Sequence, residues 1–191
     1  MIYSALNYIS DLLNENLKNE FSIPGNTKKV VLSNILNPDG TSVQNIDDKI
    51  VFFLIKLDEE TTLKNNLNRS VDNVGGGFAQ RKATINLNMH IIFCANFVAQ
   101  QYGEGLQYLS AVIRFFQNNN GLDPKLSNKN SENNRLQFEL CNLEFSELSH
   151  VWSAIGGKIL PSVIYKVRLL TMNGTSVSKM IPSIKEPKKE L

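Results

Sequence analysis

The feature that most constrains the fold is the block 136–172, whose pattern is that of strand, short helix, glycine pair and strand. Apolar and polar residues alternate from Leu136 to Cys141, the period-two pattern of a half-buried strand. Ser146 is placed to cap a helix, and Gly156-Gly157 to end it in the left-handed conformation that glycine adopts cheaply. The apolar face of this helix consists of Leu148, Val151, Trp152 and Ile155.

The second strand of this block opens at Pro161 and places Lys166 and Arg168 on the face opposite its apolar residues. That apolar face consists of Val163, Tyr165, Val167 and Leu169. The block offers neither a nucleophile paired with a base nor a set of metal ligands. It therefore predicts architecture rather than chemistry.

The size and composition predict one soluble domain with a tail. The chain has 191 residues, of which 42% are apolar and 20% charged. No apolar run approaches the roughly 20 residues that span a bilayer, and the N-terminal segment lacks the basic region and cleavage site of a signal peptide. Two cysteines without such a signal are expected to be reduced, packed thiols.

The net charge of +2 resides in the tail 179–191, which carries four lysines and two glutamates. The rest of the chain is neutral, so no basic stripe indicates a nucleic-acid partner. Two prolines and few apolar residues predict that this tail is an extended arm.

The remaining periodic segments predict an α+β fold, a mixed and mostly antiparallel sheet flanked by helices. Residues 49–57 form a nearly continuous apolar run, as expected of a central strand covered on both faces. The other predicted elements are a helix over 2–17, strands over 30–36 and 84–94, and a helix over 103–117 with Leu106, Leu109, Ile113 and Phe116 on its apolar stripe.

Two polar stretches predict connectors. Residues 58–82 contain Gly75-Gly76-Gly77 and are interpreted as a long loop, which in a compact domain is usually functional or disordered. Residues 118–134 are rich in asparagine and broken by glycine and proline.

The sequence offers only weak candidates for a metal, phosphate-binding or catalytic site. His90 and Cys94 lie on one predicted strand about 13 Å apart at about 3.3 Å per residue, too far to share a metal ion. Gly156-Gly157-Lys158 lacks the upstream glycine and the following Ser or Thr of a phosphate-binding loop. Acidic groups 47–48 and 58–60 flank opposite ends of a strand. We therefore expect no enzyme, no metal and no cofactor.

Basic residues remain as candidate assembly contacts, because arginine is enriched at protein interfaces. They lie in the long loop, on the last strand and in the tail, and comprise Lys64, Arg69, Arg81, Lys82, Lys166, Arg168, Lys179 and Lys185.

Five blocks, in this order, carry a family resemblance: MIYSALNYISDLLNENL, DDKIVFFLIKLDEETTLKNN, INLNMHIIFCANF, YGEGLQYLSAVIRFFQNN and LQFELCNLEFSELSHVWSAIGGKILPSVIYKVRLLTM. Together they resemble the tail terminator, or cap, proteins of phage-tail-like contractile injection systems, the group of the Photorhabdus virulence cassette and antifeeding prophage caps. The resemblance covers roughly residues 1–173 and implies a terminator domain there, followed by an extended basic arm over 174–191.

The resemblance implies a structural role and a fold similar to phage tail terminators. Such proteins form a homo-hexameric ring at the tail end distal to the baseplate, stop the inner tube, lock the last sheath ring and fix particle length. The implied partners are the sheath protein, the inner tube protein and a second cap paralogue, with no nucleic acid and no membrane insertion. Assembly is expected in the cytoplasm, as part of a contractile particle.

Two further hypotheses remain open from the sequence. The chain could be a cap adaptor or tube-initiating protein that plugs the lumen, or a soluble assembly or loading factor of the same particle. In the cap hypothesis, the loop 61–82 reaches the lumen, the tube or a neighbouring subunit, and the arm 174–191 adds strand-like pairing to sheath subunits.

Overall fold

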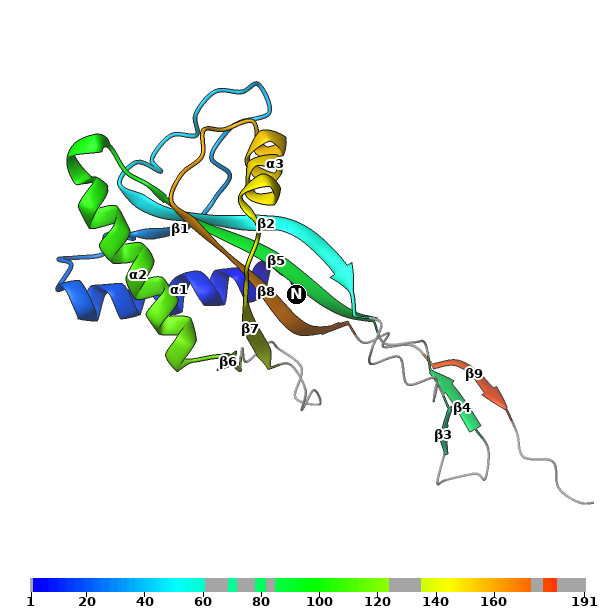
Figure 1. Ribbon diagram of the computed structural model, residues 1–191. Helices are drawn as coiled ribbons and strands as arrows, with labels where there is room; N and C mark the ends of the chain where they lie inside the picture. Colours follow the sequence, from blue (N-terminus) through cyan, green and yellow to red (C-terminus); the bar gives the residue numbers. More distant parts are fainter. Residues whose placement is uncertain are drawn as a thin grey trace, which may run out of the picture.

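The computed structural model describes residues 2–60, 69–71, 78–81, 85–123, 135–172 and 177–181. A six-stranded sheet forms the middle layer, with α1 and α2 on one face and α3 on the other (Figure 1). The elements along the chain are α1 (Ile2–Phe21), β1 (Val30–Leu32), β2 (Lys49–Glu59), β3 (Arg69–Val71), β4 (Phe78–Arg81), β5 (Ile85–Asn96), η1 (Ala99–Gln101), α2 (Tyr102–Asn118), β6 (Gly121–Leu122), β7 (Leu136–Cys141), α3 (Phe145–Ile155), β8 (Ser162–Met172) and β9 (Val177–Ile181).

The large sheet has the strand order β1-β2-β5-β8-β7-β6. Strand β1 runs parallel to β2, and the other neighbours in this sheet are antiparallel. The α+β class and the mixed, mostly antiparallel sheet are therefore confirmed. The apolar run predicted as a central strand is β2, whose first half is buried under helices of both layers.

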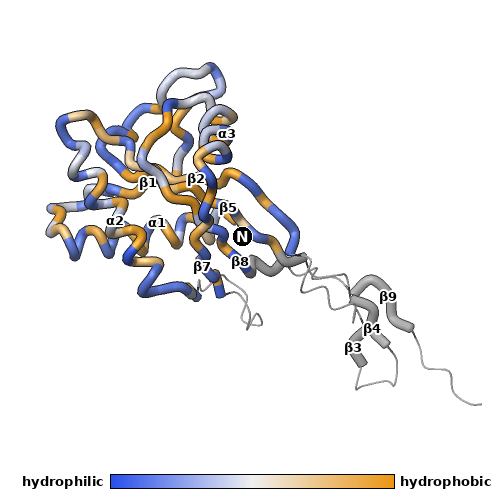
Figure 2. Tube along the Cα trace, in the orientation of Figure 1, coloured by the Kyte–Doolittle hydropathy of each residue, from blue (hydrophilic) through white to orange (hydrophobic). Residues whose placement is uncertain are grey.

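The main core lies between the sheet and the pair α1 and α2. Phe93 of β5 stands at its centre, with ring centroids 5.0 Å from Phe52, 5.4 Å from Phe116 and 6.0 Å from Tyr165. In Figure 2 hydrophobic residues recur along the strands of the large sheet and alternate with hydrophilic ones along α1 and α2. The apolar side of α1 packs here, since Leu6, Ile9, Leu13 and Leu17 are all buried.

A second, smaller core lies under α3. Trp152 is fully buried there and packs with Ile92, Cys94 and Ile164, on the sheet face opposite Phe93. Strand β5 is therefore covered on both faces along its second half. Alternate residues face opposite cores, since Ile91 and Phe93 belong to the main core and Ile92 and Cys94 to the second.

The structure corrects the N-cap that the sequence predicted for α3. The N-cap is Glu144 rather than Ser146, and Glu144 and Glu147 form a capping box in which the Glu147 carboxylate accepts from the Glu144 backbone N–H at 3.0 Å. The C-terminal end is as predicted, because Gly156 has a φ of 79°. A glutamate replaces the expected serine because the box satisfies two backbone N–H groups at once.

Two apolar residues are more exposed than the periodicity predicts. Leu106 of α2 is 39% exposed, because the buried side of that helix is centred on Tyr108, Leu109 and Val112. Leu140 of β7 is 46% exposed, although it shares a sheet face with buried Leu136 and Phe138. The pattern located α2 and β7 correctly and did not show where the cover over their apolar residues ends.

The stretches predicted as connectors contain strands. Strands β3 and β4 lie within 58–82, β9 lies within the predicted arm, and β6 lies within 118–134. The order β3-β4-β9 in the small sheet repeats β2-β5-β8, since β3 follows β2, β4 precedes β5 and β9 follows β8. The predicted hinge at Gly75-Gly76-Gly77 lies outside the described residues.

Candidate assembly surfaces

A row of polar residues crosses the α3 face of the sheet beyond the second core. Lys56, His90, Lys166 and Glu139 are register partners on four adjacent strands, β2, β5, β8 and β7. The Asp58 carboxylate accepts hydrogen bonds from Lys56 Nζ at 2.9 Å and from His90 Nε2 at 2.8 Å. Asp58 therefore joins the Lys56 and His90 side chains at one end of the row.

The electrostatics of this row are those of paired surface charges. The Lys56 hydrogen bond, with a smaller contribution from His90, holds the pKa of Asp58 below its ordinary value of 3.8. Within the described part of the chain, no serine, threonine or cysteine side chain bonds to His90, and no cluster of potential metal ligands occurs. The row lacks the parts of a nucleophilic or metal site.

Of the predicted contacts, Lys166 and Arg168 both lie on β8, Lys166 within this row and Arg168 two residues beyond it. Arg168 donates to the Glu139 carboxylate at 2.7 Å, and its Nε is buried with no partner. A groove of about 320 Å³ beside them is lined by Arg135, Gln137 and Glu139 among others. Arg69, Arg81 and Lys179 lie on β3, β4 and β9, whereas Lys64, Lys82 and Lys185 lie outside the described residues.

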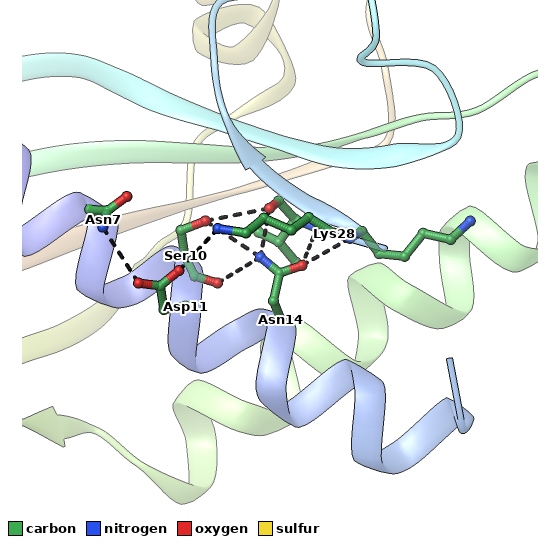
Figure 3. Close-up of polar contacts among 7 residues, drawn as sticks. Asn7, Ser10, Asp11, Asn14 and Lys28 are labelled. Carbon is green, nitrogen blue, oxygen red and sulfur yellow. Dashed lines mark hydrogen bonds and ion pairs between the residues drawn. The ribbon is translucent and has the colours of Figure 1, made fainter. Parts of the chain in front are cut away.

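One outer edge of the sheet is closed by a side chain. Asn14 of α1 accepts from the backbone N–H groups of Lys29 at 2.9 Å and Val30 at 3.0 Å, and donates to the Val30 carbonyl at 2.8 Å. Figure 3 shows this amide inserted between the helix and β1. The backbone of Val30 is therefore satisfied within the chain, which protects the start of the β1 edge.

The opposite edge is open. Strand β6 pairs only with Leu136 and Gln137, and the Phe138 N–H donates to the Asn120 carbonyl at 2.9 Å. Because outward-facing backbone groups alternate along a strand, the next outward pair belongs to Leu140, which has no strand beside it in the described structure.

Exposed apolar side chains accompany this open backbone. Leu140 is 46% exposed, Leu143 is 39% exposed and Phe145 is 77% exposed, all within six residues of the chain. We call residues 138–141 with Leu143 and Phe145 the β7 edge. Sequence reasoning missed it, since Leu140 alternates like a core residue and no local pattern reports that its neighbour strand stops early.

A second apolar surface lies at the end of α3. A groove of about 660 Å³ separates the segment 34–40 from α3 and β2. Its apolar lining includes Ile35, Leu36 and Pro38 on one side, and Val151 and Ile155 on the other. The groove has no charged residue in its lining.

The comparisons with known proteins bear on what these surfaces serve. The family model of the Pvc16 N-terminal domain matches residues 5–186, nearly the whole chain. The chain belongs to the Pvc16 N-terminal domain family. A search of curated proteins gives no match. None of the described helices is long and apolar enough to cross a membrane.

Solved structures share the fold of this Pvc16 N-terminal domain. The sheath/tube terminator of the PVC extracellular contractile injection system, in its extended state, matches with a TM-score of 0.64 and 14% identity over 100% of this chain. The tube-terminating cap of the anti-feeding prophage matches with a TM-score of 0.58 and 14% identity over 96% of this chain. The chain spans 63% and 60% of those two structures, less than two thirds of their length.

Proposed function

We propose that this chain is a tail terminator, the cap that ends the sheath and inner tube of a contractile injection system. The observation that carries the proposal is the family match over residues 5–186. The similarity of the fold to a sheath/tube terminator over the whole chain supports it. On this proposal the cap is a homo-hexameric ring that contacts sheath and tube proteins and fixes particle length. The particle is assembled in the cytoplasm.

The architecture suits a structural role in an assembly rather than a catalytic one. A closed ring of identical subunits needs two different surfaces on each subunit, which meet around the axis. The closed β1 edge and the open β7 edge give the sheet two unlike sides. Asp58 and Glu139 on the α3 face are paired with basic side chains of the same chain, which favours the apolar surfaces as the ones that drive association.

Deletion of the gene in the producing strain tests the proposal. We expect tubes and sheaths of uncontrolled length, or unstable sheaths, in negative-stain images, and normal particles after complementation. The purified protein should form six-fold rings that decorate one end of the particle. Normal particles without the gene, or a monomer that never joins them, would overturn the cap and favour a soluble loading factor.

A further inference from the structure

We propose that the groove beside β6 and β7 binds a carboxylate of a partner protein between the guanidinium groups of Arg135 and Arg168. The groove has a volume of about 320 Å³ and is lined by residues 120–121, Arg135, residues 137–139 and Arg168. Its floor is a row across three strands, because Gly121 is the register partner of Gln137 and Gln137 that of Arg168. Neighbouring residues of a strand point to opposite faces, so this row lies opposite Phe138 of the main core.

Gly121 allows the Arg135 guanidinium to lie against β6. A Cβ on residue 121 would overlap with Arg135 Nε and would lie 2.7 Å from Arg135 Cζ. Glycine thus permits a close approach that a side chain at this position would block. Arg135 has no ion pair within the described residues. Its charge is therefore available to a group that enters the groove.

Arg168 is only partly paired. Its Nη2 donates to the Glu139 carboxylate at 2.7 Å, whereas its Nε is buried without a hydrogen-bond partner. Arginine and carboxylate commonly pair through two parallel hydrogen bonds, and this pair has one. The two side chains are also 43% and 57% exposed, and such surface pairs contribute little to stability. A second carboxylate can therefore join or replace Glu139 at low cost.

The cluster around the groove carries more positive than negative charge. Lys166 is the register partner of Glu139 and has no ion pair in the part of the chain that the structure describes. With Arg135 and Arg168 it makes three cations around the one carboxylate of Glu139. Asp123, just beyond β6, pairs with neither arginine. Charge complementarity therefore favours an acidic ligand, and guanidinium groups bind carboxylates with matching geometry.

The source of the carboxylate follows from size and from the proposed cap function, on which this step rests. A groove of about 320 Å³ holds a few side chains, and the chain lacks the basic stripe of a nucleic-acid-binding protein. Strand β6 is the last strand at this edge of the large sheet. We therefore assign the ligand to an aspartate or glutamate side chain of a neighbouring protein in the particle.

Fluorescence anisotropy with the full-length chain and a labelled Glu-Gly repeat peptide tests the groove. The Glu peptide should bind, and the same peptide with Gln in place of Glu should not. R135Q and R168Q should each weaken binding about fivefold, the change that corresponds to about 1 kcal/mol for one exposed ion pair. R114Q is the matched control, because Arg114 is an exposed arginine on α2 that pairs with Glu20 at 3.3 Å.

Two further substitutions test the geometry. G121A should weaken binding as much as R135Q, because the new Cβ displaces the guanidinium while the net charge is unchanged. G103A is its control, since a Cβ there meets nothing within 4 Å. E139Q should tighten binding by removing the competing carboxylate, whereas E20Q, with the same change of charge, should not. Urea unfolding checks that each variant is folded.

Equal binding of the Glu and Gln peptides, equal weakening by R114Q and R135Q, or wild-type binding by G121A would overturn the proposal. Inorganic phosphate that competes as well as the Glu peptide would assign the groove to a free anion and would also overturn it.

Complementation of the deletion strain separates this inference from the proposed function. The chain with both R135Q and R168Q should give fewer capped particles than R114Q. Equal numbers of capped particles would show that the groove is no assembly contact, while the cap function stands. Failure of the wild-type chain to restore particle length would defeat the proposed function itself.

Discussion

At the scale of single residues, Asn14 has the largest structural role of any polar side chain described here. It lies on α1, whose apolar side packs against the sheet, and its amide forms three hydrogen bonds to the backbone of residues 29 and 30. It also donates to the Ser10 carbonyl at 2.8 Å. The side chain therefore acts as the neighbour that β1 lacks.

Asn14→Ala should lower the free energy of unfolding by about 2–3 kcal/mol, because two strand N–H groups and one carbonyl lose their partners in a half-buried site. Asn7→Ala is the matched control, since Asn7 lies on the same helix and makes one exposed contact to Asp11 at 3.4 Å. It should change stability by less than about 0.5 kcal/mol. Urea unfolding measures both, and equal losses would refute this role for Asn14.

Cys94 makes stability depend on alkaline pH. Burial raises its pKa from 9.0 to about 12, so the fold favours the neutral thiol. This contribution is full below pH 9 and is lost as pH rises toward 12, by about 1.4 kcal/mol per pH unit. Cys94→Ala should cost about 1 kcal/mol at pH 7 through loss of the hydrogen bond to Val51, and the deficit should shrink or reverse by pH 10. The free energy of unfolding of the wild type and of Cys94→Ala, measured against pH under reducing conditions, tests this prediction. Two curves that stay parallel from pH 7 to pH 10 would contradict it.

At the scale of elements, α2 shows how two glycines in one helix turn can have opposite roles. Gly103 has open space around its Cβ position, whereas a Cβ on Gly105 would lie 2.7 Å from the Phe97 ring. Gly105 is buried where α2 crosses the chain that leaves β5. Glycine there sets the close approach of the helix to the sheet.

Gly103→Ala should stabilise the protein by about 0.5–1 kcal/mol, because alanine has the higher helix propensity. Gly105→Ala should destabilise it by about 1–3 kcal/mol, because the added methyl overpacks the site against Phe97. Thermal and urea unfolding of the pair provide the comparison. If both substitutions stabilise the protein, the Phe97 ring moves aside without loss of stability, and the prediction for Gly105 is wrong.

At the scale of the whole molecule, the fold separates residues that hold it together from residues that are free to bind. Phe93 is fully buried at the centre of the main core, whereas Phe145 is 77% exposed beside the β7 edge. Only their position in the tertiary structure distinguishes their roles.

Phe93→Ala should cost about 3–5 kcal/mol of stability through lost contacts and a residual cavity. Phe145→Ala should leave the unfolding midpoint unchanged and weaken self-association and ring formation. Urea unfolding combined with sedimentation velocity distinguishes the two effects. A loss of stability in Phe145→Ala comparable to that in Phe93→Ala would show that the residue belongs to the fold.

The sequence by itself determined the existence and type of the long elements. A nearly continuous apolar run located β2. Period-two and helical patterns located β5, β7, β8 and the three α-helices, because a face that must be buried repeats at a spacing set by local backbone geometry. The Gly156 turn followed for the same local reason. The α+β class then followed from the order of these elements.

The tertiary structure alone decided which edges close and which surfaces stay open. Strands β3, β4, β6 and β9 have only two to five residues each, so pairing with distant segments defines them rather than their own periodicity. The closure of β1 by Asn14 joins residues sixteen positions apart, and the exposure of Leu140 depends on where β6 ends. Local pattern reports that a face is apolar. Only the packed fold determines whether something in the same chain covers it.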